Sequence, residues 1–192
     1  MAFSMNRISF FFLFFIFSLD LVAQASKKET VDFIKSRLDY NAQWNEEWYH
    51  DLKLLRYDYQ NDTLYYKVHY IRAGKPSKSF RVDAIPIKDI NPGRIRIVNM
   101  IGDSDDMGIE LYTNYGRESI VSYQENPLID GEPLFYTTPC DFFPICHKMT
   151  SKHVTLLFPE WVIQTQGIDI TNRVKKAILH LIELSGGTGE KF

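Results

Sequence analysis

The sequence lacks an excess of basic charge, a cysteine-rich motif and, after its first 25 residues, any long hydrophobic run. Its 22 Lys and Arg residues stand against 24 Asp and Glu residues, so a formal net charge of -2 leaves no basic field to collect nucleic acid phosphates. A membrane span needs about 20 predominantly apolar residues, and no later segment approaches that length. We therefore expect no nucleic-acid partner and no stable membrane insertion.

Residues 1–25 have the pattern of a secretory signal peptide. One arginine precedes the apolar run Ile8–Phe17, and an A-x-A cleavage site ends at Ala25. Ser26 follows in place of the cysteine that lipoprotein anchoring needs. The sequence therefore predicts an exported protein, periplasmic or secreted, in which residues 26–192 form a single domain.

The whole chain contains 45% hydrophobic and 24% charged residues, a composition typical of globular proteins. Apolar residues at helical spacing predict an opening helix over Glu29–Leu38. The pattern then changes to short runs rich in Val, Ile, Tyr and Phe, which favours antiparallel strands joined by hairpins. These runs are Leu52–Tyr59, Thr63–Ile71, Ser79–Ile87, Arg94–Met100, Gly108–Thr113 and Glu118–Tyr123. A last strand or strand pair is expected over Val154–Gln166, where Pro159 allows a bend.

A second helix is expected over Thr171–Leu184, where an apolar stripe can cover one face of the sheet. Asp169 or Thr171 can cap its start, and Gly186-Gly187 can end it. Four prolines and little periodicity predict a long loop insertion over residues 124–153. The fold class is therefore α+β: a mainly antiparallel meander or partly open barrel of about seven strands, with an N-terminal helix and a C-terminal capping helix.

The two cysteines, Cys140 and Cys146, lie inside the expected insertion. In an exported protein we expect them to form a disulfide, which over so short a loop stabilises the fold by about 2 kcal/mol. Their spacing matches neither Cys-x-x-Cys nor Cys-x-x-Cys-His, so no metal is expected. The alternative, which excludes the disulfide, is a copper or zinc site with soft ligands from the same segment: His147, Met149 and His153 beside the two thiols.

Gly102-Asp103-Ser104 follows an apolar strand and resembles the first block of the GDSL or SGNH hydrolases. The resemblance implies that Ser104 is the nucleophile of a secreted serine hydrolase. That family also has alternating strands and helices and a late Asp-x-x-His, whereas here Asp169 is followed by Asn172. We therefore expect no enzyme and no cofactor, and the hydrolase stands as an alternative.

The aromatic residues Trp44, Trp48 and Tyr49 are the candidate binding residues. Together they can form a platform for a sugar or a peptide. The spacing of four between the two tryptophans is also typical of core contacts on a helix.

Four basic residues straddle an expected hairpin tip: Arg72, Lys75, Lys78 and Arg81. A solvated, charged tip is the ordinary interpretation of such a cluster. The alternative is a phosphate site, although neither a helix N-terminus nor a glycine nest supports it.

The order of elements ends in a helix from Asn172 to Leu184, followed by Ser185-Gly186-Gly187. This order resembles small exported proteins of Bacteroidetes and is similar to a pleckstrin-homology-like barrel, in which a C-terminal helix plugs a bent antiparallel sheet. The resemblance implies binding rather than catalysis. Because the first hairpin, Gln60-Asn61-Asp62, has no basic residue, phosphoinositide recognition is not implied. We expect a non-enzymatic binding or protein-interaction module of the cell envelope, which holds a peptide or protein partner at a sheet edge or beside the terminal helix.

Overall fold

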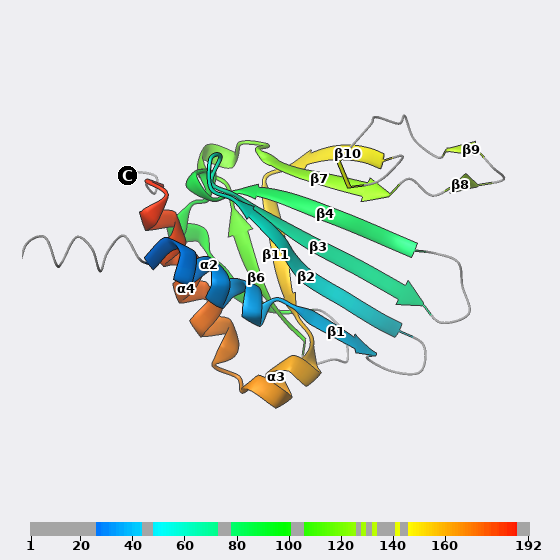
Figure 1. Ribbon diagram of the computed structural model, residues 1–192, viewed down its shortest axis with the longest axis horizontal. Helices are drawn as coiled ribbons and strands as arrows, with labels where there is room; N and C mark the ends of the chain where they lie inside the picture. The colour runs from blue at the N-terminus through cyan, green and yellow to red at the C-terminus, as the bar shows by residue number, and fades with distance from the viewer. Residues whose placement is uncertain are drawn as a thin grey trace, which may run out of the picture.

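The computed structural model describes residues 26–43, 48–72, 78–100, 106–125, 128–129, 132–133, 141–142 and 146–187 (Figure 1). The expected signal peptide, residues 1–25, lies outside this part of the chain. None of the helices within the described ranges has the length and apolar character needed to cross a membrane.

The described chain consists of helices and antiparallel strands. The α-helices are α2 (Ser26–Arg37), α3 (Glu160–Gln166) and α4 (Ile170–Leu184), and the short 3-10 helices are η1 (Ile87–Asp89), η2 (Pro92–Arg94) and η3 (Asn114–Gly116). The strands are β1 (Tyr40–Gln43), β2 (Trp48–Asp58), β3 (Thr63–Arg72), β4 (Lys78–Pro86), β5 (Arg96–Asn99), β6 (Met107–Tyr112), β7 (Ile120–Glu125), β8 (Leu128–Ile129), β9 (Glu132–Pro133), β10 (Cys146–Ser151) and β11 (His153–Phe158).

Two antiparallel sheets form the body of the domain. One has six strands in the order β1-β2-β3-β4-β7-β10, and the other has three in the order β11-β6-β5. The pair β8 and β9 forms a separate two-stranded ladder. All of these pairings are antiparallel, which confirms the expected α+β meander, and the sheets remain open rather than closing into a barrel.

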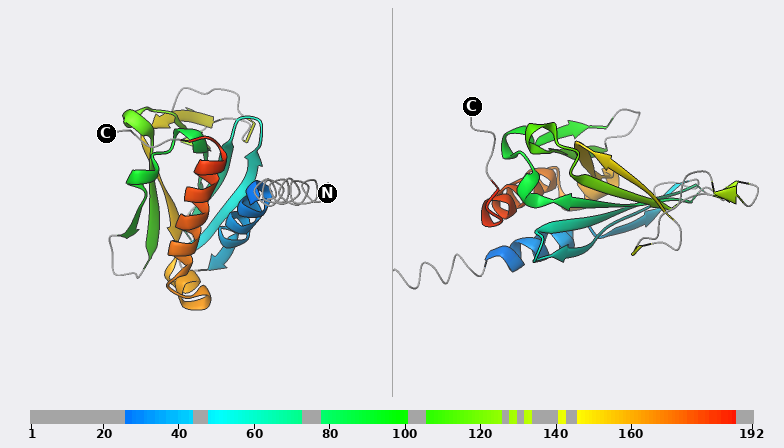
Figure 2. Two further views of the ribbon diagram at one scale, coloured as in Figure 1. Left: turned by 90° about the vertical axis from the view of Figure 1, so that its left-hand side faces the viewer. Right: turned by 90° about the horizontal axis from the view of Figure 1, so that it is seen from above.

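Helix α4 fills the space between the two sheets (Figure 2). It packs against α2 on one side and against β5 and β6 on the other. The stripe of apolar residues expected on this helix is buried at Val174, Ile178 and Leu181. On α2, Ile34 and Leu38 are equally buried, so both helices contribute to one continuous core. The prediction of a C-terminal covering helix is therefore confirmed.

The ends of α4 are built differently from one another. At its C-terminus, Gly186 has a φ of 72°, and the backbone N–H of Gly187 donates to the carbonyl of Ile182 at 2.9 Å. This is the glycine-dependent helix end that the sequence predicts. At its N-terminus, Asp169 makes no capping hydrogen bond through its side chain.

A polar cluster ties both helices to the β2–β3 hairpin. The Tyr57 hydroxyl donates to Asp62 Oδ1 at 2.8 Å and lies 3.2 Å from the Ser185 hydroxyl, while Lys27 forms an ion pair with Asp62. Although burial alone would raise the pKa of Asp62, the bonds from Lys27 and Tyr57 hold it below the usual range. The cluster therefore joins the start of α2 and the end of α4 to the same turn.

The prediction of a strand over Val154–Gln166 is wrong for the second half of this range, which forms a helix. Strand β11 ends at Phe158, and α3 begins directly after Pro159. The Asp106 carboxylate, which precedes β6, accepts a hydrogen bond from the backbone N–H of Glu160 at 2.7 Å. Proline suits the start of a helix because the first N–H groups have no partner within the helix. Asp106 supplies one of those missing acceptors from a distant part of the sequence.

We expect Asp106→Ala to lower the free energy of unfolding by about 1 kcal/mol, because the Glu160 N–H loses its acceptor. Urea unfolding followed by circular dichroism measures this change. Asp169→Ala is the matched control, since Asp169 also lies at a helix start but caps nothing through its side chain. Equal losses in both variants would contradict the capping role of Asp106.

The expected loop insertion over residues 124–153 contains regular structure. Strand β10 pairs with β7 along its whole length, from Cys146 opposite Glu125 to Ser151 opposite Ile120. The short ladder of β8 and β9 also lies in this range. The prolines of this segment favour a loop when the sequence is considered alone. Proline is nevertheless tolerated in short strands and edge strands, where the pairing stays intact.

Candidate functional site

The two sheets meet at a sharp bend between β10 and β11. Ser151 ends β10 at the edge of the six-stranded sheet, and β11 begins at His153 and crosses over that sheet (Figure 1). The backbone N–H of Leu157 donates to the Tyr66 hydroxyl of β3 at 3.3 Å, so the free edge of β11 rests on the sheet. One side of β11 faces the core with α4, and the other side bounds a corner above β4, β7 and β10.

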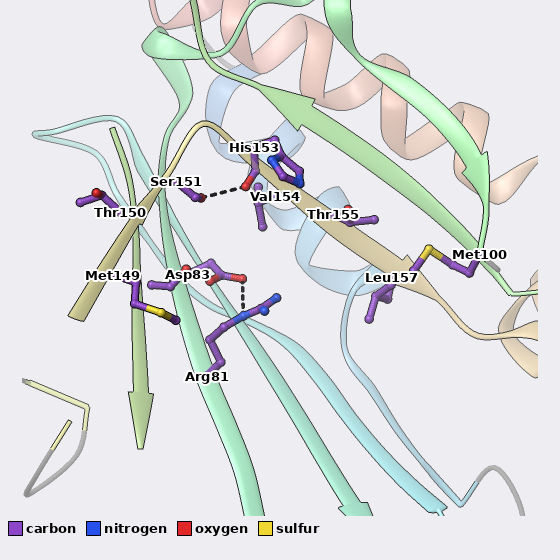
Figure 3. Close-up of a pocket in the computed structure, with 11 residues that line it drawn as sticks. Arg81, Asp83, Met100, Met149, Thr150, Ser151, His153, Val154, Thr155 and Leu157 are labelled. Atoms are coloured by element: carbon purple, nitrogen blue, oxygen red, sulfur yellow. Dashed lines mark hydrogen bonds and ion pairs between the residues drawn. The ribbon is translucent and has the colours of Figure 1, made fainter. Parts of the chain in front are cut away.

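This corner holds a cavity of about 380 Å³, which we call the corner groove (Figure 3). It is mixed in chemistry, with charged, hydroxyl, thioether and aliphatic side chains. The lining residues are Arg81, Asp83, Met100, Ser122, Met149, Thr150, Ser151, His153, Val154, Thr155 and Leu157. Its volume lies in the range of small-ligand sites.

A buried carboxylate lies at the base of the corner groove. Asp83 is 1% exposed, and its Oδ1 accepts a hydrogen bond from the Ser122 hydroxyl at 2.6 Å. Its Oδ2 accepts from Arg81 Nε at 3.1 Å. Burial raises the pKa of Asp83 above the usual range, although the bonds from Arg81 and Ser122 act in the opposite direction. The sheet thus fixes one end of the Arg81 guanidinium against a buried acid.

The sequence folds this way because strand side chains alternate between the two faces of a sheet. Arg81 and Asp83 are two apart on β4, so they share the inner face with the core residue Ile85. In the register, Asp83 lies opposite Tyr66 on β3 and opposite Ser122 on β7. The acid and its hydroxyl partner are therefore cross-strand neighbours.

The walls of the groove are apolar and closely fitted. Met100, Met149 and Leu157 contribute flexible or aliphatic side chains. A Cβ at Gly108 would lie 2.6 Å from Thr155 Cγ2 and 3.1 Å from Met100 Sδ. Glycine at this position is what lets these two lining side chains lie over β6. The rim is polar: the exposed His153 ring stacks on Tyr112, with centroids 5.5 Å apart.

The raised pKa of Asp83 predicts a pH dependence of stability. A group whose pKa is higher in the folded state stabilises that state when protonated, and this contribution is lost as the pH rises above about 4 and through the raised pKa. Relative to Asp83→Asn, which does not titrate, the wild-type free energy of unfolding is therefore expected to fall between pH 4 and the raised pKa. Urea unfolding of both proteins across this range measures the difference. A difference that stays constant or grows with pH would contradict the assignment.

The predicted aromatic platform does not coincide with the corner groove. Trp44 lies outside the described residues. Trp48 and Tyr49 begin β2, where their backbones pair with Arg72 and Ile71, and their side chains are not among those described. The interpretation of the Trp44–Trp48 spacing as that of a helix is wrong, because Trp48 lies in strand β2. Binding by these three residues stays a prediction.

The basic cluster at the expected hairpin tip is divided by the structure. Arg81 lies within β4 on the inner face, bonded to Asp83, rather than in a solvated tip. Arg72 ends β3 and Lys78 begins β4, while Lys75 lies outside the described residues. The tip interpretation is wrong for Arg81 because this residue lies inside the strand expected over Ser79–Ile87, where its side chain bonds Asp83 on the inner face.

Cys146 lies at the start of β10 on the outer face of the six-stranded sheet. Cys146 and Val82 are fully buried side by side. Three partly buried aromatic residues pack against them: Tyr65, Tyr123 and Phe142. Cys140 lies outside the described residues, so the disulfide stays a prediction that a free-thiol count under denaturing, non-reducing conditions tests. Among the side chains that the structure describes, no three of His, Cys, Asp or Glu gather closely enough to hold a metal ion.

Of the soft ligands in the alternative metal site, two lie at the corner groove. Met149 and His153 line it, whereas Cys146 packs on the opposite face of the sheet. Ser104, the candidate hydrolase nucleophile, lies outside the described residues. Its flanking strands, β5 and β6, pair antiparallel, and the Met100 N–H donates to the Asp106 carbonyl at 2.9 Å.

No protein-family model, curated protein or solved structure matches this chain. The pleckstrin-homology-like resemblance and the expected peptide partner therefore stay predictions.

Proposed function

We propose that the protein is an exported, non-enzymatic binding module whose ligand occupies the corner groove. The observation that carries this proposal is the buried Asp83 at the base of a cavity of about 380 Å³. Burying a carboxylate is costly unless it is hydrogen-bonded, and here both oxygens accept bonds that hold Arg81 and Ser122 in place. A polar group held so firmly beside apolar walls is typical of small-ligand sites.

Two further features support a binding role. The side of β11 that faces the core is closed by Leu156 and Phe158, and Val154 packs into the core while also lining the groove, so the scaffold under the groove is firmly packed. The opposite side presents Thr155 and Leu157 to the cavity. On this strand, Leu156 and Phe158 therefore serve the core, whereas Thr155 lines the groove. Proposed export rests on the N-terminal pattern alone.

Methionine methyl spectroscopy tests the proposal. The chain has five methionines, so labelling their methyl groups with ¹³C gives a simple spectrum. Met100 and Met149 line the groove, whereas Met107 packs against the main core and serves as an internal control. The probes are 4-phenylbutyrate, its amide and 4-phenylbutylamine, each titrated alone.

We expect at least one probe to shift the Met100 and Met149 signals together and saturably, with Met107 unchanged. If no probe moves the two groove signals, or if Met107 moves equally, the groove is not the binding site for small ligands and the proposal fails.

A further inference from the structure

The charges of the corner groove select among ligand classes. Its lining contains one guanidinium, from Arg81, and one carboxylate, from Asp83. Asp83 is 1% exposed and both of its oxygens already accept hydrogen bonds, so it offers little to a cationic ligand. Arg81 is 39% exposed at its side chain and extends into the groove (Figure 3). The accessible charge is therefore positive.

Arg81 is held so that its donors remain usable. The guanidinium has five N–H donors, and its Nε is the one that binds Asp83. Within the described residues, no acceptor forms a hydrogen bond with the two η nitrogens. Two parallel N–H groups on these nitrogens match the two oxygens of a carboxylate, a geometry that adds specificity as well as affinity.

The surroundings of Arg81 fit a monoanion with an apolar body. Met100, Met149 and Leu157 line the same cavity, and thioether side chains adapt to irregular apolar shapes. Because the neighbouring Asp83 carboxylate offsets the charge of Arg81, a dianionic phosphate would meet one cation beside one anion. A single negative charge on an apolar molecule is the better match.

Resting on the proposed function, we infer that the ligand of the corner groove carries a carboxylate, which binds the η nitrogens of Arg81 while its apolar part lies between Met100 and Met149. A free apolar acid and the C-terminus of a peptide share this chemistry. Asp83 acts as a positioning residue, because it orients Arg81 while both of its own oxygens are already hydrogen-bonded within the protein.

The test compares each carboxylate with its own amide by isothermal titration calorimetry. The pairs are 4-phenylbutyrate with 4-phenylbutanamide, and N-acetyl-Leu-Phe with its C-terminal amide. We expect the wild-type protein to bind one of the acids at least tenfold more tightly than its amide. The pair that shows the difference identifies the source, either a free acid or a peptide end.

Arg81→Gln is expected to lose this preference, and Arg81→Lys to retain part of it. Arg56→Gln is the matched control, since Arg56 lies on the outer face, 4.4 Å from the centroid of Tyr65, and is expected to bind as the wild type does. Thermal melts of each variant show whether it is folded, and the wild-type comparison of acid with amide needs no variant.

If acid and amide bind equally while Met100 and Met149 shift, the groove binds ligands but the carboxylate inference is overturned. If neither acid moves those methyl signals but 4-phenylbutylamine or an amide does, only the carboxylate inference is overturned; if none of these probes moves them, the proposed function fails as well. An unchanged preference in Arg81→Gln would also overturn the inference.

Discussion

Phe158→Ala is expected to lower the free energy of unfolding by about 3–5 kcal/mol, because it empties a fully buried site where β11 meets the main core. The side chain is among the largest that the fold buries completely. Chemical denaturation followed by tryptophan fluorescence or circular dichroism measures the loss. The change removes packing on the core side of β11 and leaves the groove side untouched.

Leu157→Ala is the matched control for that substitution. Leu157 is the neighbour of Phe158 on the same strand, but it is only partly buried: it packs against the main core and also lines the corner groove. Its truncation is expected to cost about 1 kcal/mol of stability and to weaken ligand binding. If Leu157→Ala destabilises the protein as much as Phe158→Ala, the two sides of β11 do not have the separate roles assigned here.

Ile178→Ala is expected to cost about 2–5 kcal/mol, the range for removing a large aliphatic side chain from a core. Ile178 is fully buried on α4, which packs against α2, β5 and β6. The loss therefore measures how strongly the terminal helix holds the two sheets together.

Lys176→Ala is the control on the same helix, since Lys176 is exposed. It is expected to change stability by less than about 0.5 kcal/mol. A small effect of Ile178→Ala, comparable with this control, would show that α4 does not carry the core between the sheets.

Much of the fold could be predicted because it depends on local periodicity. Local sequence signals mark the opening helix, the strands from β2 to β7 and the helix that ends before Gly186. Each of these signals lies within a few residues of its element. Helix α3 differs: Pro159 is equally compatible with a bend in a strand, and the helix start is completed by Asp106, 54 residues from Glu160. That contact leaves no local signal.

The corner groove could not be predicted for the same reason. Ser122 and Asp83 are 39 residues apart, and the bond that seats β11 joins Leu157 to Tyr66 across 91 residues. One signal was available: Arg81 and Asp83 alternate around Val82, which places two opposite charges on one face of a strand.

A crystal structure of the protein with 4-phenylbutyrate tests the central claim most directly, which is that the corner groove is a preformed ligand site. The predicted result is a carboxylate within hydrogen-bond distance of the η nitrogens of Arg81, with the phenyl ring between Met100 and Met149. Asp83 and Ser122 are expected to keep the bond of 2.6 Å that they have without ligand. A ligand bound elsewhere, or a groove left empty at saturating ligand, would contradict the account.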